Sequence, residues 1–126
     1  MTSFNVINNN VPFEIKVSDL NQYTTFYKIK HIINASKVVV FMKGNAFFPQ
    51  CGFSANTVKI LNHFNLSFAT FDILTDMEIR QALKEYSRWP TYPQIYFNGE
   101  LIGGNDILTE MAQNGDLEKL INESQK

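Results

Sequence analysis

The sequence predicts a single α/β domain with a four-stranded mixed sheet and helices on both faces. Two observations carry this prediction: the hydrophobic period alternates between helical and strand-like spacings along the chain, and an Asn-Gly pair separates two short apolar runs. A chain of 126 residues has room for one compact core. Because 44% of the residues are hydrophobic, that core can form without disulfides or a structural metal.

The first half of the domain is predicted to run helix, strand, helix, strand. Between residues 23 and 35, apolar residues recur at spacings of three and four, which indicates a helix. Residues 37–42 form a continuous β-branched and aromatic run, typical of a strand buried on both faces. We expect a second helix over 51–64 and a second strand over 67–72. Since a crossover helix joins them, the two strands should be parallel.

The second half is predicted to contain a helix, an antiparallel hairpin and a last helical region. Asp76 is a suitable cap for the helix, which a Trp-Pro pair ends. Strands over 94–97 and 100–102 flank the Asn-Gly turn, which makes them antiparallel neighbours. Asp106 then opens the last helical region.

The first 22 residues are predicted to differ from the rest of the chain. They contain three consecutive asparagines and scattered single aromatics, with no helical or strand period. We therefore expect a weakly ordered extension over 1–22 and the folded domain over 23–126.

Charge and hydropathy restrict the classes of function. With 11 basic against 12 acidic residues, the formal net charge of -1 disfavours a nucleic-acid or anionic-lipid partner. No apolar run approaches the ~18 residues that a membrane span needs, and no basic-then-apolar signal pattern begins the chain. We expect a soluble intracellular protein, cytoplasmic or, as the alternative, in the mitochondrial matrix.

Cys51 is the one cysteine of the chain, so an intramolecular disulfide is excluded. It lies where the helix after the first strand begins, at the edge of the sheet where α/β proteins place their sites. Helix N-terminal amides favour the thiolate, and Lys43 adds positive charge. Two interpretations follow: a reactive thiol that attacks disulfides or binds metal, or a small buried hydrophobe of no chemical role.

Three stretches, 43–54, 89–94 and 98–106, favour the reactive interpretation. The first contains Lys43, Gly44, Pro49 and Gln50 followed by Cys51, Gly52, Phe53 and Ser54. The second reads Trp-Pro-Thr-Tyr-Pro-Gln, and the third begins at the Asn-Gly turn and ends in Gly-Gly-Asn-Asp. Together and in this order they resemble the monothiol (CGFS-type) glutaredoxin family over about residues 36–121, which implies a thioredoxin-like fold.

The resemblance implies chemistry that needs a second molecule. Ser54 stands where dithiol relatives carry a resolving cysteine, so two-cysteine chemistry within the chain is excluded. The family points to a 2Fe-2S cluster, which needs about four thiolate ligands. Two Cys51 thiolates and two glutathione thiolates would complete it in a glutathione-dependent homodimer. The alternative is an enzyme that reduces protein–glutathione mixed disulfides through Cys51, with glutathione as resolver.

The resemblance also assigns a glutathione site, residue by residue. Lys43 and Arg80 would take the glycine carboxylate. Tyr92, which precedes an expected cis proline, would pair its backbone with the cysteinyl part. Asn105 and Asp106 would hold the γ-glutamyl end, the helix amides facing its carboxylate and Asp106 its ammonium group. Each of these residues also has an ordinary structural interpretation, as a solvated helix face, a turn or a helix start.

The family resemblance also implies protein partners. The family implies a BolA-like protein or an apo iron-sulfur protein as partner, while a thioredoxin-like interaction module with an inert cysteine is the non-redox alternative.

The sequence departs from the family over residues 45–48, Asn-Ala-Phe-Phe, where proline and acidic residues are common. Phe47 and Phe48 are open to three interpretations: packing on the domain, a partner contact, or a lid over the cluster.

Overall fold

The computed structural model describes residues 12–124 of the chain. Its strands, in chain order, are β1 (Phe13–Ile15), β2 (Val38–Met42), β3 (Ala69–Asp72), β4 (Gln94–Phe97) and β5 (Glu100–Gly103). Its helices are the 3-10 helix η1 (Val17–Leu20) and the α-helices α2 (Thr25–Ile33), α3 (Gly52–His63), α4 (Met77–Ser87), α5 (Asn105–Asn114) and α6 (Asp116–Ser124).

The sheet is mixed, with the strand order β1-β3-β2-β4-β5. β2 and β3 are parallel, as the crossover helix requires, and β4 pairs antiparallel with both β2 and β5. The expectation of four strands is wrong, because β1 adds a fifth strand parallel to β3 at the edge of the sheet. β1 has three residues, of which Ile15 alone is buried, so it is too short to show an alternating period.

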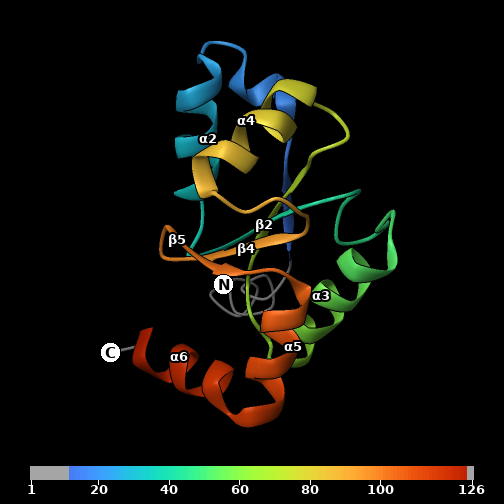
Figure 1. The fold of residues 1–126 in the computed structure, drawn as a ribbon, viewed down its shortest axis with the longest axis vertical. Helices are drawn as coiled ribbons and strands as arrows, with labels where there is room; N and C mark the ends of the chain where they lie inside the picture. The colour runs from blue at the N-terminus through green and yellow to red at the C-terminus, as the bar shows by residue number, and fades with distance from the viewer. Residues whose placement is uncertain (1–11, 125–126) are drawn as a thin grey trace, which may run out of the picture.

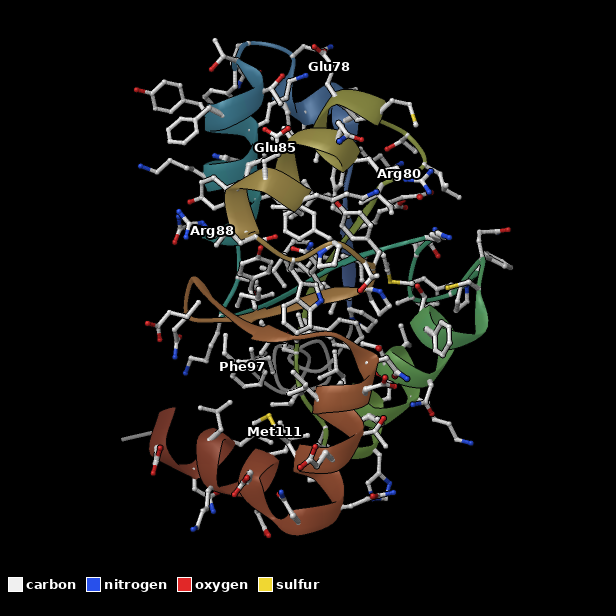
Figure 2. The ribbon with its side chains drawn as sticks, viewed as in Figure 1. Glu78, Arg80, Glu85, Arg88, Phe97 and Met111 are labelled. Atoms are coloured by element: carbon white, nitrogen blue, oxygen red, sulfur yellow. The ribbon has the colours of Figure 1, made fainter. Side chains whose placement is uncertain are left out.

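Helices cover both faces of the sheet and enclose two cores (Figure 1). α2 and α4 pack on one face, and α3, α5 and α6 lie on the other. Every residue of β2 is buried, with its side chains divided between the two cores, which confirms the prediction of a strand covered on both faces. Figure 2 shows Phe97 of β4 and Met111 of α5 in the second core, between the sheet and the last helices.

Local signals in the sequence set the element boundaries. Asp76 caps α4, because its Oδ1 accepts a hydrogen bond from the Ile79 amide at 3.0 Å. The hairpin turn has positive φ at both Asn98 (51°) and Gly99 (83°), the conformation of a two-residue turn that joins twisted strands. The last helical region is divided at Gly115, whose φ is 91°.

Residues 13–20 belong to the folded domain, so the prediction of weak order over 1–22 is wrong for them. Leu20 is fully buried and Ile15 nearly so, and both contact the core beneath α2 and α4. Residues 1–11 of the predicted extension lie outside the described residues. Among the described helices, none has the length and apolar character of a membrane span.

Truncating Leu20 tests whether this segment contributes to stability. Leu20→Ala should lower the free energy of unfolding by about 2–5 kcal/mol, because it opens a cavity in a closed core. Ser18→Ala, at an exposed position of the same 3-10 helix, should change it by no more than about 0.5 kcal/mol. Chemical denaturation measures both, and equal stability of the two variants would contradict the placement of Leu20.

Candidate functional site

The carboxyl ends of β2 and β3 are joined through one carboxylate. Asp72, the last residue of β3, accepts hydrogen bonds at Oδ1 from the amides of Gly44 and Leu74, each at 2.9 Å. Gly44 has a φ of 86°, and a side chain there would collide with the carbonyl of Phe48. The amide of Gln50 donates to the Lys43 carbonyl at 2.8 Å and closes the base of the loop. The loop over residues 43–50 therefore leaves β2 in a fixed direction and returns to start α3.

Asn45 organises the tip of this loop. Its Oδ1 accepts hydrogen bonds from the amides of Phe47 and Phe48, both at 2.9 Å, and its Nδ2 donates to Glu14 Oε1 of β1 at 3.3 Å. Phe47 and Phe48 are left 65% and 72% exposed. They do not pack on the domain, so that interpretation of the pair is wrong for this structure.

Cys51 is the N-cap of α3, at the end of the loop. Its Sγ accepts a hydrogen bond from the Ser54 amide at 3.4 Å, and the Ser54 hydroxyl oxygen lies 3.3 Å from Sγ. Ser54 is fully buried, and its Oγ accepts from the Lys43 amide at 3.3 Å, which leaves the hydroxyl proton for the sulfur. Cys51 itself is partly exposed. The thiol is thus held by backbone and side-chain donors yet open on one side.

These contacts favour the thiolate. Partial burial by itself raises the pKa of the Cys51 thiol, but the Ser54 hydroxyl, the amides of Ser54 and Phe53 and the charge of Lys43 together bring that pKa below its ordinary value. From the sequence, the helix amides and Lys43 were predicted to lower the pKa of Cys51. The Ser54 hydroxyl, which contributes more than Lys43, was assigned no such role.

Two adjoining cavities bring the six predicted site residues together. A cavity of about 520 Å³ is lined by Cys51, Lys43, Tyr92 and Asn105, among others. A second cavity, of about 650 Å³, shares the last three residues and extends to Arg80 and Asp106. The stretches 43–54, 89–94 and 98–106 thus meet around the thiol, although they are far apart in the sequence.

The larger cavity is cationic. Lys43, Arg80 and Lys84 line it, and within residues 12–124 none of the three forms an ion pair with a carboxylate. Figure 2 shows Arg80 on α4 toward the side where the loop between β2 and α3 projects, whereas Arg88 lies at the other end of the helix. Among the described residues that line the cavity, Asp106 is the one acidic residue. The cavity therefore suits a ligand with more than one negative group.

Side-chain hydrogen bonds hold the segment between α4 and β4, whose residues 89–93 line the larger cavity. The Tyr92 hydroxyl donates to the Arg80 carbonyl at 2.7 Å, and burial raises the pKa of Tyr92, so the hydroxyl stays protonated as a donor. Gln94 Nε2 donates to the Trp89 carbonyl at 3.0 Å. The peptide bond between Tyr92 and Pro93 is cis, as expected from the sequence.

Asn105 is fixed by α3 through two residues that the sequence did not indicate. Its Oδ1 accepts hydrogen bonds from Asn56 Nδ2 at 2.9 Å and from the Thr57 hydroxyl at 3.1 Å. Asn105 is the first residue of α5, and Gly104 is the N-cap. The side-chain carbonyl is thus occupied within the protein, and the N-terminus of α5 is held beside that of α3. No local pattern marks Asn56 or Thr57, because their partner is 48 or 49 residues away.

Comparison with known protein families agrees with this geometry. The profile of the glutaredoxin family, described as "Glutaredoxin", matches residues 38–102, from the start of β2 to the hairpin. The chain belongs to the glutaredoxin family. Because the profile begins at β2, β1 and α2 of this glutaredoxin lie outside the matched region.

Similar proteins carry the name monothiol glutaredoxin. This glutaredoxin is 54% identical over 94 residues to an uncharacterized monothiol glutaredoxin ycf64-like of Synechocystis, covering 75% of this chain and 88% of that protein. It is 48% identical over 98 residues to a probable monothiol glutaredoxin 2 of Rickettsia typhi, covering 78% and 88%. Glutaredoxin 3 of Danio rerio is 49% identical, but the match covers 83% of this chain and 31% of that longer protein.

Solved structures confirm the thioredoxin-like fold of the glutaredoxins. Reduced apo GrxS14 of poplar is 43% identical, with a TM-score of 0.71 over 79% of this chain and 92% of that one. A monomeric truncated mutant of 1-C-Grx1 from Trypanosoma brucei is 34% identical, with a TM-score of 0.74 over 82% and 94%. The single cysteine and Ser54 place this glutaredoxin in the monothiol branch.

Replacing Ser54 tests what sets the pKa of the thiol in this glutaredoxin. Ser54→Ala should raise the pKa of Cys51, because the thiolate loses its side-chain donor. Lys43→Gln should raise it less, since the charge of Lys43 is the smaller cause. The ultraviolet absorbance of the thiolate across a pH titration measures both, with Cys51→Ser as the blank. A larger rise in the Lys43 variant would contradict this order of causes.

Proposed function

We propose that this monothiol glutaredoxin binds glutathione and, as a homodimer, holds and transfers a 2Fe-2S cluster as its cargo. The observation that carries the proposal is the position of Cys51. A thiol of lowered pKa lies partly exposed at a cavity lined by cations that form no ion pair with any residue of the described range 12–124. Such a site offers one thiolate and a binding site for an anionic molecule that carries a second thiolate.

The ligand count supports a shared cluster. A 2Fe-2S cluster is held by about four thiolates, and this chain has one. Within the part of the chain that the structure describes, no group of three or more His, Cys, Asp and Glu side chains is placed to hold a metal ion. A partly exposed thiolate fits one position of such a cluster. We therefore assign two positions to the Cys51 residues of two chains and two to glutathione thiolates.

The cavity fits glutathione, an anionic tripeptide with two carboxylates and one ammonium group. We assign Lys43 and Arg80 to its glycine carboxylate and the backbone of Tyr92 to its cysteinyl part, since the Tyr92 side chain is engaged elsewhere. The backbone amide of Asn105, at the N-terminus of α5, faces the γ-glutamyl carboxylate in this assignment, and Asp106 its ammonium group. The Asn105 side chain then acts by positioning, through its hydrogen bonds with α3.

A second candidate function uses the same thiolate as a nucleophile. The lowered pKa of Cys51 favours attack on the disulfide between glutathione and a protein thiol, which releases the protein thiolate and leaves glutathione bound to Cys51 by a disulfide. A second glutathione thiolate then attacks that disulfide, so that Cys51 leaves as thiolate and oxidised glutathione forms. The activity would be that of a glutathione-dependent oxidoreductase.

The partner is a prediction from the family resemblance, and the compartment is a prediction from the hydropathy and N-terminal pattern of the sequence. The proposed partners of the loaded dimer are a BolA-like protein and apo iron-sulfur proteins that accept the cluster. The proposed compartment is the cytoplasm, with the mitochondrial matrix as the alternative. Both compartments keep thiols reduced, which suits a protein whose thiol must stay free.

Anaerobic reconstitution with iron, sulfide and glutathione tests the cluster proposal. We expect one 2Fe-2S cluster for two chains, a visible absorption band and a dimer in size-exclusion chromatography. Cys51→Ser should lose all three while remaining folded, because the hydroxyl occupies nearly the same space. Omitting glutathione should also prevent loading. A colourless monomer that still reduces a glutathionylated substrate would favour the oxidoreductase instead.

Arg80 provides a separate test of the glutathione site. Arg80→Gln should weaken binding of S-methylglutathione, which has no free thiol, about tenfold, corresponding to about 1.4 kcal/mol. The control is Arg88→Gln, because Arg88, the C-cap residue at the opposite end of α4, is exposed and does not line the cavity. Titration calorimetry measures both affinities. Equal losses in the two variants would indicate a general effect of charge and would overturn the assignment.

A further inference from the structure

A cluster of polar side chains joins α3 to the first turns of α5. Asn56 and Thr57 of α3 both donate hydrogen bonds to Oδ1 of Asn105, the first residue of α5, at 2.9 and 3.1 Å. Thr109, one turn further along α5, donates to the Asn105 backbone carbonyl at 2.8 Å and accepts a second hydrogen bond from Asn56 Nδ2 at 3.2 Å. We call Asn56, Thr57, Asn105 and Thr109 the helix bridge.

The helix bridge fixes which end of the Asn105 side chain faces α3. The hydroxyl of Thr109 gives its one proton to the Asn105 backbone, so the group of Asn56 that meets this hydroxyl must be the NH2 donor. The same NH2 group and the Thr57 hydroxyl then occupy both acceptor sites of Asn105 Oδ1. A reversed Asn105 amide would set donor against donor. The side chain therefore has one orientation, and α5 begins at one position relative to α3.

The start of α5 depends on this bridge because its own N-cap provides no side chain. The N-cap is Gly104, and no side-chain hydrogen bond caps the helix there. The first amides of a helix have no acceptor within the helix, so they are free to bind a ligand. In the glutathione complex proposed above, these amides face the γ-glutamyl carboxylate. The place where α5 offers them is thus set from α3.

The helix that holds α5 also carries the thiol. Cys51 is the N-cap of α3, and Asn56 and Thr57 follow it by five and six residues. Cys51, Asn56 and Asn105 line the smaller cavity together. Thr57 is fully buried and belongs to the lining of neither cavity, so its hydroxyl reaches a ligand only through Asn105.

We propose that Thr57 and Asn56 are positioning residues that determine the selectivity of the site for a γ-glutamyl thiol peptide. The inference rests on the proposed function, which places glutathione between Cys51 and the N-terminus of α5, and deepens it. Because the bridge holds the two helix ends at one separation, a ligand sulfur meets Cys51 while its γ-glutamyl carboxylate meets α5 only if the peptide spans that separation. A shorter thiol peptide without the γ-glutamyl group makes no contact with α5 and gains nothing from the bridge.

Small changes in the bridge should be enough to reach the ligand. A binding group that is misplaced by about 1 Å makes weaker contacts, and a group held in place before binding loses less entropy when the ligand arrives. Loss of the Thr57 hydroxyl leaves Asn105 Oδ1 with one donor in a closed position. The start of α5 would then be free to shift, and the affinity for the γ-glutamyl end should fall.

Thr57→Val tests the proposal, because valine has nearly the shape of threonine but no hydroxyl. Titration calorimetry compares S-methylglutathione with S-methylcysteinylglycine, which lacks the γ-glutamyl group. The unaltered chain should prefer S-methylglutathione, and Thr57→Val should lower that preference about fivefold, the effect of one buried hydrogen bond. The affinity for the shorter peptide should stay within about twofold, since its contacts do not include α5. Thr57→Ser, which keeps the hydroxyl, should restore the preference.

Asn56→Ala is a second variant, at a half-buried position, and decides the question if Thr57→Val does not fold. It removes the other donor to Asn105 Oδ1, so it should also lower the preference for S-methylglutathione. The matched control is Asn62→Ala, at an exposed position of the same helix, which should keep the full preference.

The two peptides separate failure of the inference from failure of the proposed function. Equal affinity of the unaltered chain for both peptides would overturn the γ-glutamyl assignment, and the inference with it. A preference that Thr57→Val and Asn56→Ala both retain would leave that assignment standing and overturn the inference alone. Losses of equal size for both peptides would also overturn it, because they would indicate a general structural role for the bridge.

Discussion

The site depends on the parallel pairing of β2 and β3, whose carboxyl ends are joined by Asp72. Parallel strands connected by α3 must both end at the same edge, so the chain that leaves β2 has to turn there before the helix begins. Asp72 fixes that turn from the neighbouring strand by accepting the Gly44 and Leu74 amides. A glycine with positive φ is needed at the turn because a side chain would strike the loop. These hydrogen bonds of Asp72 fix the turn after β2 and thereby place Cys51 at the N-terminus of α3.

Elements with a strong local signal could be predicted from the sequence, and those made by tertiary contacts could not. The helical periods, the buried β2 and the Asn98-Gly99 turn are properties of a few neighbouring residues, and the structure confirms them. β1 pairs over three residues and takes its stability from β3 and the core, so its own sequence carries little information. The contacts of Asn105 with Asn56 and Thr57 are also tertiary, so no local pattern in the sequence predicts them.

The site itself was more predictable than the way it is held together. All six residues expected from the family resemblance line the two cavities, because motifs of a family mark the positions that share a site. The resemblance said nothing of residues 45–48, where the chain departs from the family pattern. There the structure shows a turn made by Asn45 and anchored to β1, which lies outside the matched region. A segment outside the region that the family profile matches thus supports the loop that leads to Cys51.

Serine instead of cysteine at position 54 removes the possibility of an internal disulfide but still stabilises the thiolate of Cys51. A cysteine at this position would resolve a disulfide within the chain, whereas the hydroxyl forms no such bond. The same hydroxyl, buried and held by the Lys43 amide, lies 3.3 Å from the sulfur of Cys51 and stabilises its thiolate. The chain therefore has a sulfur that favours the thiolate but no second cysteine to pair with it. Any disulfide that Cys51 forms must take its second sulfur from another molecule, and the cationic cavity beside it suits an anionic one.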